Sequence, residues 1–298
     1  MTGYKLVTFM TAKGARPGLV IDEQVHDVRE HASVLEILRD WKKSDGALRK
    51  ASLLKRKSIP LKKAKLLAPI PDPGAIFCAG ANYTDHMEEM ARAEGRPPGP
   101  NMKQLGEKPW HFIKTSVSVV GPGATVKLPP YSQAVDWEIE LVAVIGRACK
   151  DVPAAKALDY VAGYTIANDL SARDVMRREK VEPTSPFRFD WVSQKCFDGA
   201  CPLGPWIVPA AQIADPQRLA LKLWVGEELM QDSNTSCMIF DTAEQIEMLS
   251  SRVTLRPGDL VLTGTPAGVG MPRKRFLRPG ETVRLWIESI GEFSHKVA

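Results

Sequence analysis

The sequence contains no long hydrophobic run. None of its apolar segments approaches the roughly 20 residues that a membrane-spanning helix requires. The N-terminal segment MTGYKLVTFM is too short and too polar for a signal peptide. With 44% hydrophobic and 25% charged residues, the composition is that of a globular protein with a full core. These features predict a cytoplasmic protein without a membrane partner.

Cysteine is scarce as well. The five cysteines are Cys78, Cys149, Cys196, Cys201 and Cys237. Their number is odd and no two have CxxC spacing, so neither a disulfide framework nor a thiolate zinc site is expected. A free cysteine usually behaves as a small buried hydrophobic residue, and we expect buried free thiols here.

The excess of positive charge is concentrated in one segment. The formal net charge is +5, and residues 49–65 read RKASLLKRKSIPLKKAK. Such a segment is either a solvated linker or a nucleic-acid-binding patch. Because no aromatic residue for base stacking lies within it, we expect no nucleic-acid partner. The same positive charge would also attract acidic substrates, which is a weaker requirement than binding a nucleic acid.

Short strands dominate the pattern along the chain. Residues 4–9 and 18–28 are rich in β-branched residues and predict strands, and Ser33 is placed to cap a short helix. The prolines and glycine of LLAPIPDPGAI indicate a boundary near residue 70. We therefore predict a small N-terminal α+β domain with its linker over 1–70 and a larger domain over 71–298.

The larger domain is predicted to be a β-rich α+β structure. Apolar runs such as WEIELVAVIG and TVRLWIE alternate with turn signals, among them Pro-Gly pairs. Helices are expected over 84–94, 152–159 and 242–250, the second capped by Asp151. A mixture of many strands with few helices is typical of the α+β class.

The segment DWEIELVAVIG carries an unusual set of acids. Side chains two residues apart share one face of a strand, so Asp136, Glu138 and Glu140 are expected to point the same way. Neighbouring carboxylates repel each other, and burying them is costly unless they are paired or bind a metal. The segment is therefore either part of a metal site or a solvent-facing edge strand.

A third acid strengthens the metal interpretation. Asp169 follows the apolar run VAGYTIA, and the end of a buried strand is a suitable place for a pocket. Three carboxylates with water form an all-oxygen shell, which suits Mg²⁺, Mn²⁺ or Ca²⁺ rather than zinc. The alternative is that Asp169 caps a helix formed by LSARDVMRRE.

A histidine and a lysine are candidates for proton transfer and charge neutralisation. His86 and Glu89 are three residues apart and share a helical face, where the carboxylate can orient the imidazole as a general base. Most such pairs are surface ion pairs, which is the alternative. Lys195 lies in a largely uncharged stretch and is either a stabiliser of an anionic intermediate or a surface lysine.

The glycine-rich segment TGTPAGVG at 263–270 follows the apolar run DLVL. Its backbone amides and the Thr265 hydroxyl are able to hold a carboxylate. Because the segment lacks the lysine of a phosphate-binding loop and the spacing of a dinucleotide fingerprint, no nucleotide site is expected.

Seven ordered motifs resemble one known enzyme family. They are GANYTDHMEEM, KPWHFIKT, DWEIELVAVIG, DYVAGYTIANDLSARD, QKCFDGACPLGPW, NTSCMIFDTAEQI and RPGDLVLTGTPAGVG. From about residue 70 to its end, the chain resembles the fumarylacetoacetate hydrolase family, nearest its acylpyruvate hydrolase and 5-carboxymethyl-2-hydroxymuconate isomerase branch. The resemblance implies a mixed β-roll of the family's C-terminal type behind a small N-terminal β-rich domain, and a homodimer.

The resemblance also implies roles for individual residues. Glu138, Glu140 and Asp169 match the family's metal ligands, which usually hold Mg²⁺ or Mn²⁺. The His–Glu pair of the family's mobile lid falls on His86 and Glu89. These positions agree with those that the residue patterns indicate.

Further positions concern the substrate. The family's active-site lysine falls on Lys195, and substrate-contacting positions fall on Thr265 and Lys114. Two features depart from the family pattern: Thr115 stands where proline is common, and residues 185–191 form an aromatic stretch, SPFRFDW. Both bear on the identity of the substrate.

The implied activity is metal-dependent cleavage of a C–C bond in a small 2,4-dioxo acid of the acylpyruvate type. His86, held by Glu89, would take a proton from water, and Lys195 would stabilise the departing enolate. The same site also suits an isomerase or decarboxylase of a 2-oxo or 2-hydroxymuconate-type acid through an enolate at the metal. A non-catalytic metabolite-binding protein is the alternative from another class.

Overall fold

Two apolar cores lie on opposite sides of one large β-sheet. The computed structural model describes residues 3–52 and 57–298. Within this range, the central strand β10 (Ile139–Ile145) is buried along its whole length. Ile139 and Leu141 contribute to one core, whereas Val142 and Val144 contribute to the other. The apolar run of this strand is continuous because both of its faces are covered.

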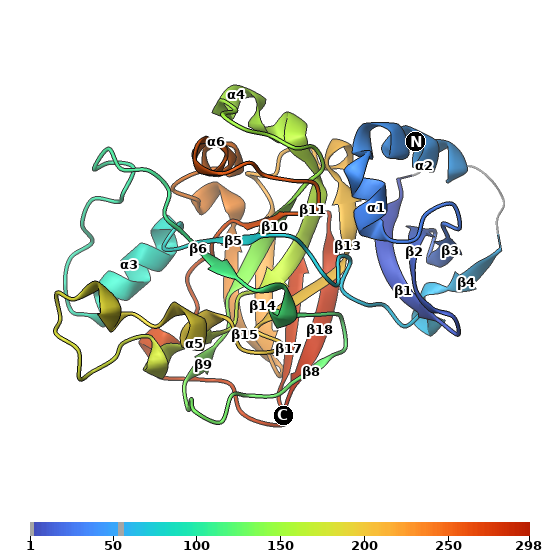
Figure 1. The fold of residues 1–298 in the computed structure, drawn as a ribbon. Coiled ribbons are helices and arrows are strands. Elements are labelled where there is room, and N and C mark those ends of the chain that lie inside the picture. Colours follow the sequence, from blue (N-terminus) through green and yellow to red (C-terminus); the bar gives the residue numbers. More distant parts are fainter. Residues whose placement is uncertain (1–2, 53–56) are drawn as a thin grey trace.

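The large sheet joins strands from both parts of the chain (Figure 1). Its order is β4-β3-β2-β1-β13-β11-β10-β16-β5-β6, and β7 also pairs with β13. Besides β10, its strands are β1 (Lys5–Thr11), β2 (Gly14–Ile21), β3 (Gln24–Asp27), β4 (Ser58–Pro60), β5 (Ile76–Ala79), β6 (His111–Lys114), β7 (Val119–Val120), β11 (Val161–Asn168), β13 (Cys201–Pro209) and β16 (Leu260–Leu262).

A second sheet covers one face of the first. Its order is β15-β14-β17-β18-β8, and the short strands β9 and β12 form a separate pair. These strands are β8 (Thr125–Val126), β9 (Val135–Asp136), β12 (Ser171–Ala172), β14 (Ala220–Val225), β15 (Glu228–Asn234), β17 (Thr282–Ile287) and β18 (Gly291–Val297). The observed class is therefore the predicted β-rich α+β fold.

The helices are short and surround the sheets. They are α1 (Val34–Arg39), α2 (Trp41–Ala51), α3 (Thr84–Ala93), α4 (Ala154–Ala157), α5 (Trp191–Lys195) and α6 (Thr242–Arg252). The 3₁₀ turns are Leu61–Lys63, Ser116–Ser118, Leu158–Tyr160, Arg173–Val175, Pro186–Arg188, Ala210–Gln212, Thr235–Cys237 and Met271–Arg273. Among the described residues, no helix combines the length and the apolar character needed to cross a membrane.

Capping explains where several helices begin. The Ser33 side chain accepts a hydrogen bond from the Glu36 amide, as predicted, and Asp241 with Glu244 forms a capping box on α6. The predicted cap at Asp151 is wrong. Asp151 has a positive φ of 52°, and α4 begins only after Pro153, which provides no side-chain cap.

The N-terminal elements extend the large sheet at one side of the molecule (Figure 1), where β1 pairs with β13 through Leu6 and Ile207. The proposed division near residue 70 remains a prediction. Of the basic stretch 49–65, residues 53–56 lie outside the described residues. All five cysteines are free. Cys78, Cys149 and Cys201 are buried as expected, whereas Cys196 and Cys237 are only partly buried.

Candidate metal centre

Two neighbouring strands bring three carboxylates together. Glu140 lies on β10 opposite Ala167 of the antiparallel strand β11, and Asp169 directly follows β11. The Asp169 amide donates a 2.9 Å hydrogen bond to the Glu138 carbonyl, which fixes the two strand ends against each other. Each of the three acids offers an oxygen, and these oxygens lie within 4.8 Å of one another. The predicted ligand set is therefore assembled in one place.

The alternatives weighed from the sequence are wrong. β10 is paired on both sides, by β11 and β16, and Glu140 and Asp169 are completely buried, so the acids do not lie on a solvent-facing edge strand. Residues 171–175 form the short strand β12 and a 3₁₀ turn, so Asp169 does not cap a helix there.

The residues fit a divalent cation. Glu140 accepts a 2.7 Å hydrogen bond from the Gly264 amide through Oε2, but its buried Oε1 has no hydrogen-bond partner among the described residues. Burial, reinforced by repulsion from Asp169 and Glu138, raises the pKa of Glu140 well above its ordinary value. An unsatisfied buried oxygen beside two further carboxylates is the donor set of a hard cation such as Mg²⁺ or Mn²⁺.

Two buried lysines neutralise the acids. Lys114 Nζ lies 2.5 Å from Asp169 Oδ1, and Lys195 Nζ lies 2.6 Å from Asp169 Oδ2. Lys195 also lies 3.2 Å from Glu138 Oε2. Burial would lower the pKa of Lys195, yet Asp169 and Glu138 together raise it. Lys195 is therefore a charged member of the site, and the alternative of a surface lysine is wrong.

Arg173 is a site residue that the sequence analysis did not single out. Its Nε lies 3.0 Å from Asp136 Oδ2, and its Nη2 contacts Glu138 Oε1. Burial would raise the pKa of Glu138, but Lys195 and Arg173 hold it at about 2. Asp136 also accepts hydrogen bonds from the Gly270 and Met271 amides, so it anchors Arg173.

The predicted His–Glu pair lies on α3. His86 Nδ1 is 4.0 Å from Glu89 Oε2, and this buried nitrogen has no hydrogen-bond partner in the described part of the chain. Glu89 also accepts a 2.8 Å hydrogen bond from the Gly268 amide. His86 is near enough to the acids to contribute to the low pKa of Glu138. The pair is thus placed beside the three carboxylates, with Glu89 docked on the glycine-rich turn.

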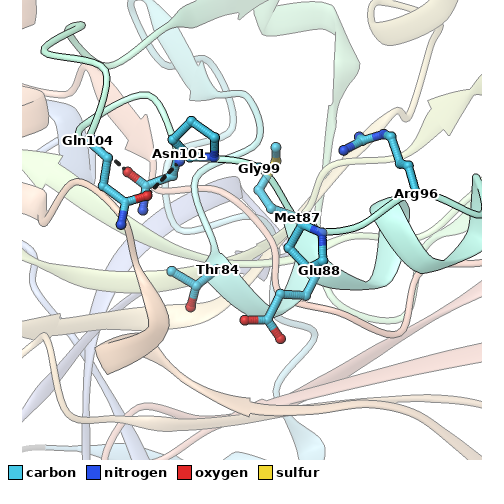
Figure 2. Close-up of a pocket in the computed structure, with 9 residues that line it drawn as sticks. Thr84, Met87, Glu88, Arg96, Gly99, Asn101 and Gln104 are labelled. Carbon is cyan, nitrogen blue, oxygen red and sulfur yellow. Dashed lines mark hydrogen bonds between the residues drawn. The ribbon is translucent and has the colours of Figure 1, made fainter.

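The other face of α3 borders a cavity of about 280 Å³ (Figure 2). Thr84, Met87 and Glu88 line it from the helix, and the loop that follows closes it, with Asn101 and Gln104 hydrogen-bonded to each other. The helix therefore lies between the acids on one side and this cavity on the other.

Thr265 lies in the glycine-rich turn after β16 and is buried. Gln231 Nε2 donates a 2.9 Å hydrogen bond to Thr265 Oγ1, and Gln231 Oε1 accepts one from the Ile139 amide. The second sheet thereby ties the turn to the start of β10. The Thr265 hydroxyl keeps its own hydrogen available for another acceptor.

Comparison with known proteins identifies relatives over nearly the whole chain. Residues 75–298 match the family described as fumarylacetoacetate (FAA) hydrolase C-terminal. A mitochondrial oxaloacetate tautomerase of Rattus norvegicus is 38% identical over 282 residues, which cover 94% of this chain and 84% of that protein.

Solved structures also resemble this chain over nearly its whole length. A 2-hydroxyhepta-2,4-diene-1,7-dioate isomerase from Mycobacterium marinum superposes with a TM-score of 0.74 at 32% identity, covering 99% of this chain and 98% of that one. A maleylpyruvate hydrolase from Sphingobium sp. SYK-6, in complex with manganese(II) and pyruvate, superposes with a TM-score of 0.76 at 28% identity over 99% and 98% of the two chains.

Proposed function

Because this chain belongs to the fumarylacetoacetate hydrolase family, we propose that it is a divalent-metal-dependent tautomerase of small 2-oxo acids. It is an enzyme of this family acting on oxo acids, and its relatives include tautomerases, isomerases and hydrolases. The observation that carries the proposal is the unsatisfied Glu140 oxygen within a buried acid triad that two lysines face.

Glu138, Glu140 and Asp169 would hold the metal, with Mg²⁺ or Mn²⁺ preferred and Ca²⁺ the third candidate. The manganese in the maleylpyruvate hydrolase structure supports this choice. When bound, the ion would supply Lewis-acid polarisation of the 2-oxo group. The acid triad provides oxygen ligands of the kind that these cations prefer.

The charge of the site suits an acidic substrate. Among the described residues, the carboxyl groups of Asp136, Glu138, Glu140 and Asp169 are balanced by only three cations, Lys114, Lys195 and Arg173. A divalent ion would convert this excess of acid into a net positive charge. A substrate carboxylate would then be attracted to a buried site of opposite sign.

The protein's own groups would move the proton. In ketonisation of an enol, the enol oxygen loses a proton and C3 gains one, so no other reactant is consumed. We assign this transfer to His86, because its Nδ1 is buried 4.0 Å from Glu89 Oε2, near the acids, and makes no hydrogen bond among the described residues, so Glu89 would orient it once the two groups close up. Lys195 and Lys114 would stabilise the developing enolate charge, and the Thr265 hydroxyl would bind the substrate carboxylate.

Hydrolysis of a 2,4-dioxo acid is the second candidate, favoured by the similarity to maleylpyruvate hydrolase. His86 would then take a proton from water, and the hydroxide would add to the distal carbonyl. Cleavage of the C–C bond would release a carboxylic acid and the enolate of a 2-oxo acid, which a proton converts to product. The same residues serve both reactions, so the substrate decides which of them occurs.

Two substrates separate the candidates. Metal-stripped protein would be given enol-oxaloacetate, with and without Mg²⁺, and the loss of the enol compared with that caused by Mg²⁺ alone. Acetylpyruvate would be tested in parallel for release of pyruvate and acetate. Faster ketonisation without cleavage supports the tautomerase, whereas cleavage of acetylpyruvate supports the hydrolase. Failure to act on either substrate when the metal is bound would contradict the proposed function.

The homodimer expected for the family is also a proposal. Light scattering of the purified chain would show whether its mass is twice the 32.8 kDa of one copy. The cytoplasmic location remains a prediction.

A further inference from the structure

Four aromatic side chains meet beside the metal centre. Phe112 lies on β6, and Trp110 directly precedes this strand. Trp191 is the first residue of α5, and Phe189 lies in the segment that leads into this helix. We call these four residues the aromatic cluster. They are far apart in the sequence, and α5 packs against β6 to bring them together.

Three of the rings form a column. Phe112 and Trp191 stack with centroids 5.9 Å apart and an interplanar angle of 12°, and Trp191 and Phe189 stack at 5.6 Å and 10°. Trp110 lies against the side of this column, 5.1 Å from the Trp191 centroid. Parallel and tilted rings at these separations attract each other beyond simple burial of apolar area.

The inner end of the column adjoins the proposed active site. Lys195 Nζ lies 4.6 Å from the Phe112 ring centroid and 2.6 Å from Asp169 Oδ2. One lysine therefore contacts both a candidate metal ligand and the first ring of the column. The aromatic cluster is therefore a direct neighbour of the residues that would hold the oxo-acid end of a substrate.

The cluster also adjoins the segment that leads into α3. The Gly80 amide donates a 3.1 Å hydrogen bond to the Trp110 carbonyl, and a Cβ at Gly80 would lie 2.4 Å from the Trp110 ring. Gly80 precedes α3 by four residues, so Trp110 packs on the segment just before this helix. The cluster thus lies between the segment that leads into α3 and helix α5, which carries Lys195.

Two rings of the cluster are incompletely covered. Trp110 is 48% exposed and Phe189 is 39% exposed. Ring faces carry negative electrostatic potential and disfavour a carboxylate, whereas they attract another flat apolar group. Two cations already face rings of the cluster: Lys195 Nζ lies 4.6 Å from the Phe112 centroid, and the Arg177 guanidinium lies 5.9 Å from the Phe189 centroid. The ring faces that remain open are those available to a ligand. The arrangement suits an apolar planar group rather than a second acid.

We propose that the aromatic cluster binds the part of the substrate farthest from its 2-oxo acid end, and that this chain favours 2,4-dioxo acids with an aryl or similarly flat apolar terminus. This inference rests on the proposed function, because it assumes that the oxo-acid end is held at the metal centre. It adds a substrate class that the acid triad by itself does not define.

The test compares benzoylpyruvate with acetylpyruvate, which share the dioxo-acid end and differ in the far group. Loss of the enol form of each compound, by ketonisation or by cleavage, would be followed with the Mg²⁺-loaded wild type, Phe189→Ala and Phe187→Ala. Phe187 is a matched control because it lies in the same segment, is 74% exposed and is outside the cluster. We expect a lower KM for benzoylpyruvate in the wild type.

Phe189→Ala should raise the KM for benzoylpyruvate by roughly threefold to tenfold, the size of one aromatic contact. The same variant should leave the KM for acetylpyruvate within twofold of the wild-type value. Phe187→Ala should change the KM for neither substrate. Equal losses for both substrates, or equal effects of the two variants, would overturn the proposal. So would a change of oligomeric state in Phe189→Ala, because the cluster would then belong to a subunit interface.

Titration calorimetry with the same two compounds keeps the inference separate from the proposed function. Tighter binding of benzoylpyruvate without turnover of any oxo acid would retain the aromatic subsite and contradict the enzymatic proposal. Turnover without a preference between the compounds would retain the enzyme and overturn the subsite. Absence of both binding and turnover would reject both.

Discussion

Glu138 and Glu140 lie two residues apart in the same acid triad, yet their pKa values are displaced in opposite directions. Lys195 and Arg173 overcome the effect of burial and hold the pKa of Glu138 at about 2. Burial and the neighbouring acids Asp169 and Glu138 raise the pKa of Glu140, whose Oε1 has no partner among the described residues. The two acids therefore make opposite contributions to the stability of the metal-free protein.

Glu140→Gln is expected to stabilise the metal-free protein, because it removes a carboxylate that is repelled by its neighbours. Glu138→Gln should destabilise it by about 3–5 kcal/mol, since Lys195 and Arg173 would lose a buried partner. Urea unfolding in the presence of a chelator measures both changes. The assignment fails if the two variants shift the unfolding free energy in the same direction.

Both substitutions should abolish tight metal binding. Groups that only support metal ligands contribute about 10–100-fold to affinity, so loss of a ligand should cost more than that. Titration calorimetry with Mn²⁺ would measure the affinity. Asp45→Asn is a control, because Asp45 belongs to a partly exposed ion pair with Arg49 on α2. Unchanged Mn²⁺ affinity in Glu140→Gln would remove Glu140 from the ligand set.

His86→Ala should lower kcat by about 10²–10⁴-fold, the usual contribution of a positioned general base. Its Mn²⁺ affinity should stay within a few-fold of the wild type, because His86 is outside the acid triad. Glu88→Gln is the matched control, since Glu88 lies on the same helix but lines the outer cavity (Figure 2). If both variants retained full activity, the proton transfer would have to be assigned to another group.

The acid triad was predictable because it follows from local periodicity. Alternation predicted that Glu138 and Glu140 share one face, and both do join Asp169 in the triad, although β10 begins only at Ile139. The His86–Glu89 pair is likewise a relation within one helix. Neither pattern by itself excluded its alternative, an edge strand for the acids or a surface ion pair for His86 and Glu89, and the resemblance to the family supplied the agreement.

Arg173 and Gln231 were not predictable in this way. Arg173 meets Asp136 because β12 pairs with β9, and Gln231 reaches the Ile139 amide from the other sheet. The aromatic cluster joins segments that are about eighty residues apart in the sequence, since Phe112 stacks on Trp191. Such contacts depend on tertiary packing, and no spacing in the sequence reports them. The predicted Asp151 cap failed for a related reason, because its positive φ is set by the turn.

Arg173→Met should destabilise the metal-free protein by about 3–5 kcal/mol, because buried Asp136 and Glu138 would lose their shared cation. Arg178→Met is the matched control. Arg178 pairs with Asp190 at 3.2 Å, but its side chain is 55% exposed, so the loss should stay below about 1 kcal/mol. Adding Asp136→Asn to Arg173→Met should restore part of the stability. Equal effects of the two arginine substitutions in urea unfolding would show that Arg173 is not a structural cation of the site.

The stability of the fold should fall in mild acid because of a buried histidine. Burial lowers the pKa of His295 to about 4, compared with about 6.5 in the unfolded chain. Asn168 Oδ1 accepts a hydrogen bond from the Glu138 amide. Asn168 Nδ2 is therefore the atom that faces His295 Nε2, at 2.9 Å, and it donates to that nitrogen. Protonation would place two donors opposite each other.

The unfolded chain therefore binds the proton more readily than the folded chain between these two pKa values. The stabilising contribution of neutral His295 is complete above about pH 6.5 and is lost as the pH falls from there to about 4. Its size is about 3 kcal/mol. Burial also lowers the pKa of His111 to about 4, so protonation of His111 further reduces the stability of the folded protein over the same pH range. Urea unfolding between pH 7.5 and 4 should show a shallower decline in His295→Gln than in the wild type, because glutamine accepts the Asn168 hydrogen bond without titrating. An identical pH dependence in both would mean that His295 is already protonated in the folded protein.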